Sequence, residues 1–422
     1  CTATNYDSKI HVFTGTCGAL TCIDGNDDAC GSASSINFPT LIGTDYYIFV
    51  GGYGSATGDY SLDISCCTPS APSCATLNYP ADNETGISPC GTLLDWDPEV
   101  STCSGTVSYD VYFGTNSTPP YLTNVSTDQY NLNFALSENT TYYWQIIPRE
   151  GGMTASSCTI KSFTTGTRSN SNYCMTDDAA NYPAGGSNCA QITDDATSQL
   201  GCIWNTGTIS FASSFDYTIN MYFGDDDGGG DGCTFVFQNS PEGISACGND
   251  GQQLGAGGIS NAVVVEFDTY DNDWPSHNWD LAEDQTAIYI GGNLATTPLA
   301  GPVVADPSDN ELEDGAIYEL RVTWDASTQD LCVYVDGNQR LCANYDFVTN
   351  VFGGNPDVYW GFTGSTGGVT NQQYFCPINI PLPIDLKSYT VSCRDGNPVL
   401  RWEIYSSFNN DYFTIEKSSD GI

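Results

Sequence analysis

The sequence predicts an all-β protein, with β-sandwiches or jelly rolls arranged in series. Short runs of β-branched and aromatic residues, such as 46–50, 142–146 and 263–267, are separated by turns rich in Gly, Asn, Asp and Pro. Helical periodicity of the apolar residues is almost absent. The 422 residues exceed one ordinary all-β core and are enough for two to four domains.

The charge balance is strongly acidic. Ten Lys and Arg stand against 51 Asp and Glu, for a formal net charge of −41, yet 40% of the residues are hydrophobic. A disordered acidic tail would be poor in aromatic residues, so the charge belongs to a folded surface. Such a surface repels nucleic acid and anionic membranes and attracts divalent cations. Two explanations remain open: adaptation to salty or calcium-rich water, or calcium ligation by some of the carboxylates.

The 19 cysteines indicate an oxidising, extracellular environment. No apolar run is long enough to span a membrane, and the two histidines have no zinc-ligand spacing with cysteine. Local spacing predicts bridges that close short loops, the last of them around a hairpin turn. The predicted pairs are Cys17–Cys22, Cys189–Cys202, Cys233–Cys247 and Cys332–Cys342.

The N-terminal part, residues 1–67, combines a strand-like run at 6–13, an acidic loop at 22–30 and a second strand at 46–53. It resembles the second half of the bacterial pre-peptidase C-terminal domain, a small β-sandwich of secreted proteins. The strands that precede this stretch in that family are absent, so the sequence is expected to begin inside a domain. The Asp and Asn residues at 24–28 are equally consistent with a calcium loop and with a solvated turn.

Two further parts resemble accessory modules. Residues 68–167 carry an early Trp96, an aromatic strand at 142–146 and a terminal strand at 161–165, and they resemble a fibronectin type III module, which implies a spacer. Residues 377–422 resemble the β-sandwich that precedes the sorting signal of Bacteroidota proteins exported by the type IX system. That resemblance also stops partway, so we expect the sequence to be an interior portion of a larger secreted protein.

The stretch 265–272 contains the candidate metal-binding residues. Side chains alternate along a strand, so Glu266, Asp268 and Tyr270 are predicted to share one face, with Asn272 following where the strand becomes a loop. Calcium takes six to eight oxygen ligands from carboxylates, amides and backbone carbonyls. These residues therefore begin a calcium site, which Asp280 in the following loop is placed to complete.

This pattern resembles the metal loop of legume-type (L-type) lectins. The resemblance covers residues 172–376 and includes the loops at 230–237, 254–259 and 359–367 in the same order. It implies a central concanavalin-like jelly roll among the tandem β-sandwiches, and a cis peptide bond before Asp231 that calcium maintains.

The resemblance also implies roles for individual residues. Asp268, Asn272 and Asp280 would bind calcium by side chain and Tyr270 by its carbonyl, and Glu266 would join Asp268 and Asp280 in a second, transition-metal site. The carbohydrate would be bound by the carboxylate of Asp231, the amide of Gly255, the side chain of Asn272, the ring of Tyr270 with Trp274 or Trp279, and a wall that contains Gly364.

The pattern departs from the family at one metal ligand. The histidine expected five residues after Asp280 is Gln285, which offers a neutral oxygen where softer metals favour imidazole. We therefore expect calcium alone. The run Asp225–Asp227 would bind a second calcium or face water, and the sequence favours water.

These observations predict an extracellular, calcium-dependent carbohydrate-binding protein, a lectin or adhesin that is secreted or surface-attached, with glycans as partners and no catalytic residues. One alternative is a structural subunit of a long adhesin or a self-associating filament, in which the lectin fold is a spacer. A lesser alternative is a β-glucan hydrolase of similar architecture that uses Glu266 and Asp271. The near match Glu266-X-Asp268-X-X-Asp271 ends in a carboxylate one methylene too short for the usual carboxyl spacing.

Overall fold

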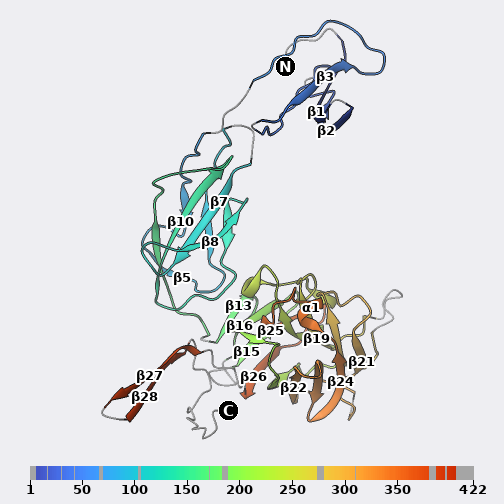
Figure 1. Cartoon of the computed structure of the whole chain (residues 1–422). Coiled ribbons are helices and arrows are strands. Elements are labelled where there is room, and N and C mark those ends of the chain that lie inside the picture. The colour runs from blue at the N-terminus through green and yellow to red at the C-terminus, as the bar shows by residue number, and fades with distance from the viewer. Residues whose placement is uncertain are drawn as a thin grey trace.

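A computed structural model of the chain describes residues 6–16, 18–29, 31–41, 43–65, 70–102, 106–170, 172–182, 189–272, 280–308, 310–379, 386–394 and 397–404. These residues form 28 strands, one α-helix (α1, Phe347–Asn350) and two short 3-10 helices. The predicted fold class, all-β with tandem β-sandwiches around a jelly roll, is confirmed. Figure 1 shows three groups of strands that follow one another from the N-terminus, and a separate hairpin near the C-terminus.

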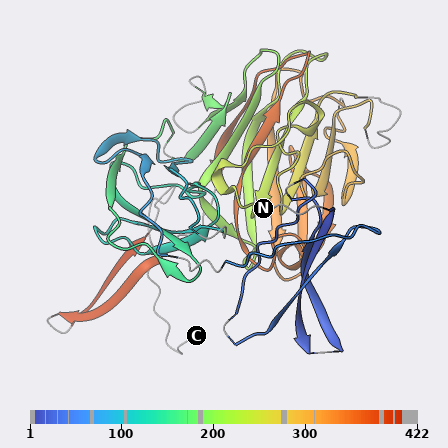
Figure 2. The ribbon, with the colours of Figure 1, turned by 90° about the horizontal axis from the view of Figure 1, so that it is seen from above.

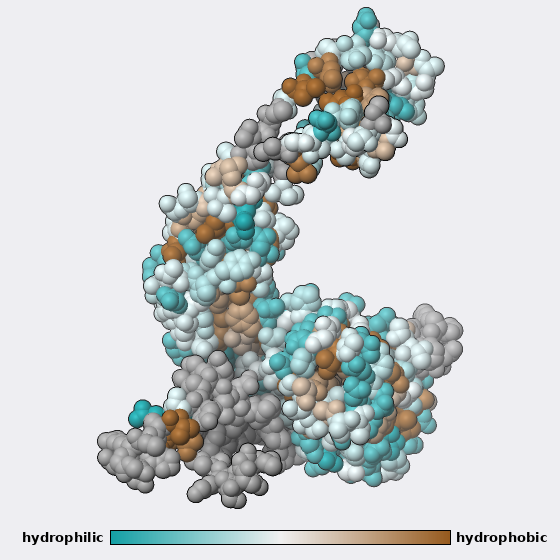
Figure 3. All heavy atoms as spheres, viewed as in Figure 1, coloured by the Kyte–Doolittle hydropathy of each residue, from teal (hydrophilic) through white to brown (hydrophobic). Residues whose placement is uncertain are grey.

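The N-terminal group is one antiparallel sheet of three strands. Its order is β2-β1-β3, with bounds β1 Ser8–Thr16, β2 Ala19–Asn26 and β3 Tyr46–Gly52. Val12 is buried, but several apolar side chains near it are exposed, among them Leu41, Phe49, Tyr53 and Ile64. The space-filling view shows hydrophobic residues gathered over this sheet (Figure 3).

The second group is a β-sandwich. One sheet has the order β5-β12-β10-β7-β8, with β11 paired to β10, and the other has the order β4-β6-β9. Trp96, Trp144 and Phe163 are fully buried between the sheets, because alternate residues of each strand face inward. The bounds are β4 Leu77–Tyr79, β5 Glu84–Ile87, β6 Leu93–Trp96, β7 Ser108–Gly114, β8 Tyr121–Val125, β9 Gln129–Asn131, β10 Thr141–Glu150, β11 Met153–Thr154 and β12 Lys161–Thr165.

The third group is the jelly roll, with two sheets of seven strands stacked face to face (Figure 2). The order of one sheet is β13-β16-β25-β18-β19-β20-β21, and that of the other is β14-β15-β26-β17-β22-β23-β24. The bounds are β13 Tyr173–Asp177, β14 Ala180–Asn181, β15 Ala190–Thr193, β16 Leu200–Ser210, β17 Phe215–Tyr222, β18 Gly232–Gln238, β19 Ala262–Asp268, β20 Gln285–Ile290, β21 Ala300–Val304, β22 Ile317–Asp325, β23 Asp330–Val335, β24 Asn338–Asn344, β25 Asp357–Ser365 and β26 Gln373–Asn379.

The strands at the centre of the first of these sheets are buried on both faces. Every residue of β18 and β19 is buried, which explains why they read as continuous apolar runs rather than as alternating ones. Inward residues such as Phe267 join the core between the two sheets, while Val264 and Trp204 pack beneath a third layer. That layer is the loop region 243–259, which contributes Leu254 and Ile259. The loop layer covers the face on which the site lies.

The disulfides correct three of the four predicted pairs. Only Cys332–Cys342, across the hairpin of β23 and β24, is confirmed. Cys22 is a free, exposed thiol, so the Cys17–Cys22 pair is wrong, and Cys17 itself lies outside the described residues. Cys233 is free and buried, so the Cys233–Cys247 pair is wrong, and the Cys189–Cys202 pair is wrong because both residues pair with cysteines from more distant elements. The other bridges among the described residues are Cys74–Cys158, Cys90–Cys174, Cys189–Cys376 and Cys202–Cys247.

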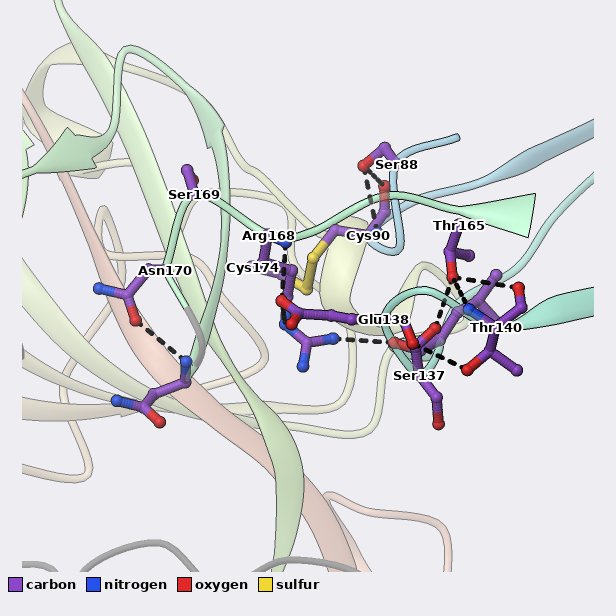
Figure 4. Close-up of polar contacts among 12 residues, drawn as sticks. Ser88, Cys90, Ser137, Glu138, Thr140, Thr165, Arg168, Ser169, Asn170 and Cys174 are labelled. Atoms are coloured by element: carbon purple, nitrogen blue, oxygen red, sulfur yellow. Dashed lines mark hydrogen bonds and ion pairs between the residues drawn. A yellow bond between two sulfur atoms is a disulfide. The ribbon is translucent and has the colours of Figure 1, made fainter. Parts of the chain in front are cut away.

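A disulfide joins the β-sandwich of the second group to the jelly roll. Cys90, in the loop between β5 and β6, is bonded to Cys174 on β13 (Figure 4). The connecting segment is fixed as well, because Arg168 donates from its side chain to the Leu136 carbonyl at 2.8 Å and from its backbone to the Glu138 carboxylate at 2.7 Å. Both the disulfide and the connecting segment at Arg168 are therefore attached to the β-sandwich.

The same joint has a second polar contact away from the bridge. The carbonyl of Asn133 accepts from the Ile244 N–H at 3.2 Å, and its side-chain amide donates to the Pro241 carbonyl at 3.0 Å. A Cβ on Gly243 would lie 1.9 Å from the Asn133 carbonyl oxygen, so the close approach requires glycine there. The second group and the loop layer of the jelly roll thus meet in direct contact.

The last described element is a two-stranded antiparallel hairpin of β27 (Leu386–Arg394) and β28 (Asn397–Ile404). Across the described residues, no helix combines the length and the apolar character needed to cross a membrane.

Candidate metal and carbohydrate site

Strand β19 places two carboxylates beneath the loop layer. Glu266 and Asp268 are 2% and 6% exposed and lie on the same face of the strand, as alternation predicts, opposite to the core-facing Phe267. Asp268 is paired with Gly232 of β18 on one side and with Gln285 of β20 on the other. It therefore stands where three strands end together, at the edge of the sheet.

The loops that follow bring Asn272 and Asp280 to the same place. The Asn272 N–H donates to the Asp280 carboxylate at 2.7 Å, and the Asn272 side-chain amide donates to the Tyr270 carbonyl at 2.9 Å. A cavity of about 30 Å³ lies among these groups, large enough for one small ion or water. Its lining residues are Gln252, Gln253, Glu266, Asp268, Asn272, Asp280, Gln285, Tyr289, Leu294 and Ala295. We call Glu266, Asp268, Asp280 and the neighbouring Asp231 the carboxylate cluster.

The carboxylate cluster is electrostatically suited to bind a cation. Burial raises the pKa of Glu266, and the Asp280 carboxylate raises it further, although a hydrogen bond with Tyr289 opposes the shift. Burial followed by the charges of Glu266 and Asp280 raises the pKa of Asp268. One oxygen of Glu266 and one of Asp231 are buried without a hydrogen-bond partner in the described part of the chain. Oxygen ligands that carry charge and lack donors fit a calcium ion well.

Gln285 occupies the position of the missing histidine, and both ends of its amide are already used. Its nitrogen donates to an Asp280 oxygen at 3.3 Å, and its oxygen accepts from the Leu281 N–H at 3.0 Å. The side chain is 3% exposed, so it has little freedom to turn. The Gln285 side chain is therefore suited to hold Asp280 in place by a hydrogen bond. It is not suited to bind a second, softer metal ion.

Asp231 enters the site just before β18. The Gly230–Asp231 peptide bond is cis, as the resemblance implied. The Asp231 N–H donates to the Ser365 carbonyl at 3.0 Å, and its own carbonyl accepts from the Thr269 N–H at 3.1 Å. Its side chain is 5% exposed, and burial together with the charge of Asp250 raises its pKa to about 6. The backbone on both sides of Asp231 is thus fixed to the strands that carry the cluster.

Two of the predicted carbohydrate contacts lie elsewhere. The Gly255 N–H donates to the Asn249 carbonyl at 2.8 Å, so this amide is used inside its own loop rather than offered to a ligand. Gly364 lies within β25, where a Cβ would meet Ile192 and Cys233, so it is an interior sheet residue. Gly367, three residues later, lies closer to the site, because a Cβ there would stand 3.2 Å from the Asp231 carboxylate.

An open groove lies beside the cavity. It has a volume of about 410 Å³, and its residues include Asp268, Asp280 and the ring of Tyr270, which is 39% exposed. Trp274 and Trp279, the predicted stacking partners of Tyr270, lie outside the described residues. Asp271 is exposed and lines this groove, whereas Glu266 lines the buried cavity. The two carboxylates of the hydrolase alternative therefore open into different spaces.

A second acidic group, which includes the groove residue Asp284, was missed by the sequence reasoning. Glu313 is 2% exposed and is hydrogen-bonded to Asp284. Burial and then the charge of Asp284 raise the pKa of Glu313, whereas burial raises the pKa of Asp284 although its hydrogen bond with Glu313 opposes the shift. Asp284 also accepts from the Leu312 N–H, and Glu313 from the Asn371 side-chain amide at 3.3 Å. We call these two residues the Asp284–Glu313 pair.

Asn371 links this pair to the loop that leads to Asp231. Its side-chain amide donates to the Asp226 carbonyl at 2.9 Å and its oxygen accepts from the Asp226 N–H at 3.3 Å. A Cβ on Gly224 or Gly229 would lie 2.1 Å from Asn371, which explains the glycines of this loop. The side chains of Asp225–Asp227 are exposed. No spacing in the sequence connects Asn371 with Asp226, so only the fold reveals the contact.

Comparison with known proteins agrees with this architecture. The family model described as the legume lectin β-barrel domain matches residues 164–379, just over half of the chain. The serine-rich adhesin for platelets of Staphylococcus aureus (strain MSSA476) is 27% identical over 199 residues, which cover 43% of this chain and only 9% of that adhesin.

Solved structures of similar fold include lectin II from Ulex europaeus and a lectin from Bauhinia forficata in complex with GalNAc. The first is 20% identical with a TM-score of 0.40 and the second 18% identical with 0.39, and each match covers 49% of this chain and 90% of that chain. The family match rests on the segment that contains both jelly-roll sheets, the carboxylate cluster and the Asp231 loop, and the chain therefore belongs to the legume-type lectin family.

Proposed function

We propose that this chain is an extracellular lectin whose carbohydrate binding depends on one calcium ion. The observation that carries the proposal is the carboxylate cluster. Within the described part of the chain, one buried oxygen of Glu266, which lines a cavity of ionic size, and one of the neighbouring Asp231 lack hydrogen-bond donors. A buried carboxylate without a partner is costly, and a divalent cation is the group that offsets several such charges at once.

Calcium would be held by the side chains of Asp268, Asn272 and Asp280 and by the carbonyl of Tyr270. The Tyr270 carbonyl accepts one hydrogen bond from Asn272 and has a second lone pair for a metal. Glu266 supplies further negative charge at the cavity wall. The engaged amide of Gln285 supports a site for calcium alone, without a transition metal.

The carbohydrate would lie above the calcium site. The carboxylate of Asp231 and the amide of Asn272 are suited to accept and donate hydrogen bonds with sugar hydroxyls, and the exposed ring of Tyr270 is suited to stack on a pyranose face. Calcium would act indirectly, by fixing the loop that contains Asn272 next to Asp231. Gly255 and Gly364 are left out of this contact set because of their positions in the structure.

A glycan array probed with calcium and with EDTA tests this function. We expect binding in calcium, its loss in EDTA and its return when calcium is restored. Asp231→Asn should abolish sugar binding while calcium binding persists, whereas Asp357→Asn, which changes an exposed carboxylate at the far end of β25, should leave both intact. Binding that is unchanged in EDTA, or no binding to any glycan, would contradict the proposal.

The proposed location and biological use rest on other observations. Five disulfides among the described residues favour an oxidising, extracellular environment. The partial similarity to a bacterial adhesin supports a role in attachment to glycans at a surface. The division into parts 1–67, 68–167, 172–376 and 377–422, with flanking modules for spacing and type IX export in Bacteroidota, remains part of this proposal.

A structural role in a filament or long adhesin is the second candidate. It is favoured by the exposed apolar side chains over the N-terminal sheet, whose outer strands β2 and β3 each have one edge without a partner strand in the described part of the chain. Sedimentation velocity across a range of protein concentrations tests it. Growth of large species with concentration would favour the filament, and a constant monomer would favour the lectin as an independent unit.

Hydrolysis is the least supported function, because Glu266 and Asp271 line different spaces. An assay on laminarin tests it directly. We expect no turnover, and turnover that Glu266→Gln abolishes would replace the lectin proposal with an enzymatic one.

A further inference from the structure

The region around the proposed carbohydrate site is strongly negative. The groove beside the calcium cavity is lined by Asp227, Asp271 and Glu283, which are exposed, and by Asp284 and Glu311, which are half-buried. These carboxylates stand in addition to Asp268 and Asp280, which line both spaces. No basic residue is among the described residues that line the groove. One calcium ion adds two positive charges to a larger number of negative ones.

The basic residues of the jelly roll are used elsewhere. Residues 172–379 contain 29 Asp and Glu but only two Arg and no Lys. Arg321 on β22 pairs with Asp216 through two hydrogen bonds of 2.7 and 2.5 Å and lies over the Tyr334 ring. Arg340 on β24 donates to the Val304 carbonyl. Both belong to the sheet that does not carry the site, and both have partners of their own.

We infer that the site selects uncharged glycans and rejects acidic ones, such as those with uronate, sulfate or sialate groups. The inference rests on the proposed lectin function and specifies its ligand class. Like charges that face one another weaken association strongly, whereas carboxylates accept good charge-assisted hydrogen bonds from neutral sugar hydroxyls. The same groove therefore favours one class of glycan and repels the other.

The test uses matched pairs of glycans that differ only in acidic groups, for example N-acetyllactosamine with and without a 3-O-sulfate, and dextran with dextran sulfate. The whole chain is saturated with calcium, and binding is measured by glycan array and by calorimetry. We expect the neutral member of a bound pair to bind at least about tenfold more tightly. The ratio should shrink at high salt, because salt screens exposed charges.

Two double variants separate local from overall charge. Asp227→Asn with Glu283→Gln removes two exposed groove carboxylates that have no place in the proposed metal or sugar contacts, and it should improve binding of the acidic member severalfold. Glu319→Gln with Asp357→Asn removes the same charge far from the groove and should change nothing.

The possible outcomes test the preference for neutral glycans separately from the proposed lectin function. Calcium-dependent binding in which the acidic member equals or exceeds the neutral one would overturn the inference and leave the lectin function standing. Failure of every pair to bind, with the fold verified by circular dichroism, would overturn both.

Discussion

The jelly roll contains two groups of buried carboxyls, the carboxylate cluster and the Asp284–Glu313 pair, and their hydrogen-bonding needs are met in different ways. In the Asp284–Glu313 pair, each carboxyl has a donor from the protein and the two are hydrogen-bonded to each other, an arrangement that one retained proton makes possible by removing one of the two negative charges. In the carboxylate cluster, one oxygen of Glu266 and one of Asp231 are buried without a donor within the described residues, although Glu266 has a hydrogen bond with Tyr289 through its carboxyl. The difference indicates that unmet acceptors, rather than the density of acidic residues, mark a metal site.

Removal of calcium should have the largest effect. If the carboxylate cluster binds calcium only when folded, a saturating concentration stabilises the jelly roll by about 4 kcal/mol at 1,000 times the dissociation constant. We therefore expect EDTA to lower the melting temperature of the jelly roll by several degrees in differential scanning calorimetry. Identical melting curves with calcium and with EDTA would show that the cluster is satisfied in another way.

The next largest effect should be a difference in calcium affinity between a mutation in the carboxylate cluster and one in the Asp284–Glu313 pair. Asp268→Asn should weaken calcium binding by more than about tenfold, because it removes a charged ligand, whereas Glu313→Gln should leave the affinity within about a factor of two. Isothermal titration with calcium measures both. If Glu313→Gln weakens binding as much as Asp268→Asn does, the distinction between the two groups is wrong.

The dependence of stability on pH should be smaller and specific to the pair. Folding raises the pKa of both carboxyls, so the folded state holds more protons than the unfolded state. The stabilisation is complete below the unfolded pKa values of about 4 and is lost as the pH rises through the raised folded values. A tenfold difference in proton affinity between the two states corresponds to about 1.4 kcal/mol.

Denaturant titrations of the calcium-saturated chain from acidic to alkaline pH measure this loss, with the cluster held constant by the metal. Glu313→Gln should flatten the curve. A curve with the same slope in the variant would mean that the pair is not its source.

The smallest effect should come from the exposed acidic run. Asp225→Asn changes a carboxylate close in sequence to Asp231 but open to water, so stability should change by no more than about 0.5 kcal/mol and calcium affinity hardly at all. A tight second calcium that this variant removes would show that exposure does not separate the two kinds of acidic group.

Periodicity and turn residues predicted the strands, and alternation predicted that Glu266 and Asp268 share a face, because both depend on neighbours in the sequence. The resemblance supplied the cis bond before Asp231. Short spacing failed for the disulfides, because Cys189 and Cys376 are 187 residues apart and meet only when β15 pairs with β26. The Asn371 contacts also depend on loops that approach from distant strands. The use of the Gly255 amide depends on how its own loop folds back to Asn249, which no periodic pattern predicts.

The joint between the β-sandwich and the jelly roll has a mechanical consequence. Two covalent paths cross it, the chain near Arg168 and the Cys90–Cys174 bridge, and the Asn133 contacts lie beside them. A single covalent connection lets two domains rotate relative to each other, whereas two separated connections fix their relative orientation. A pull along the β-sandwich would therefore turn the whole jelly roll as one rigid unit, and the edge that carries the proposed sugar site would keep a set angle to the direction of the force.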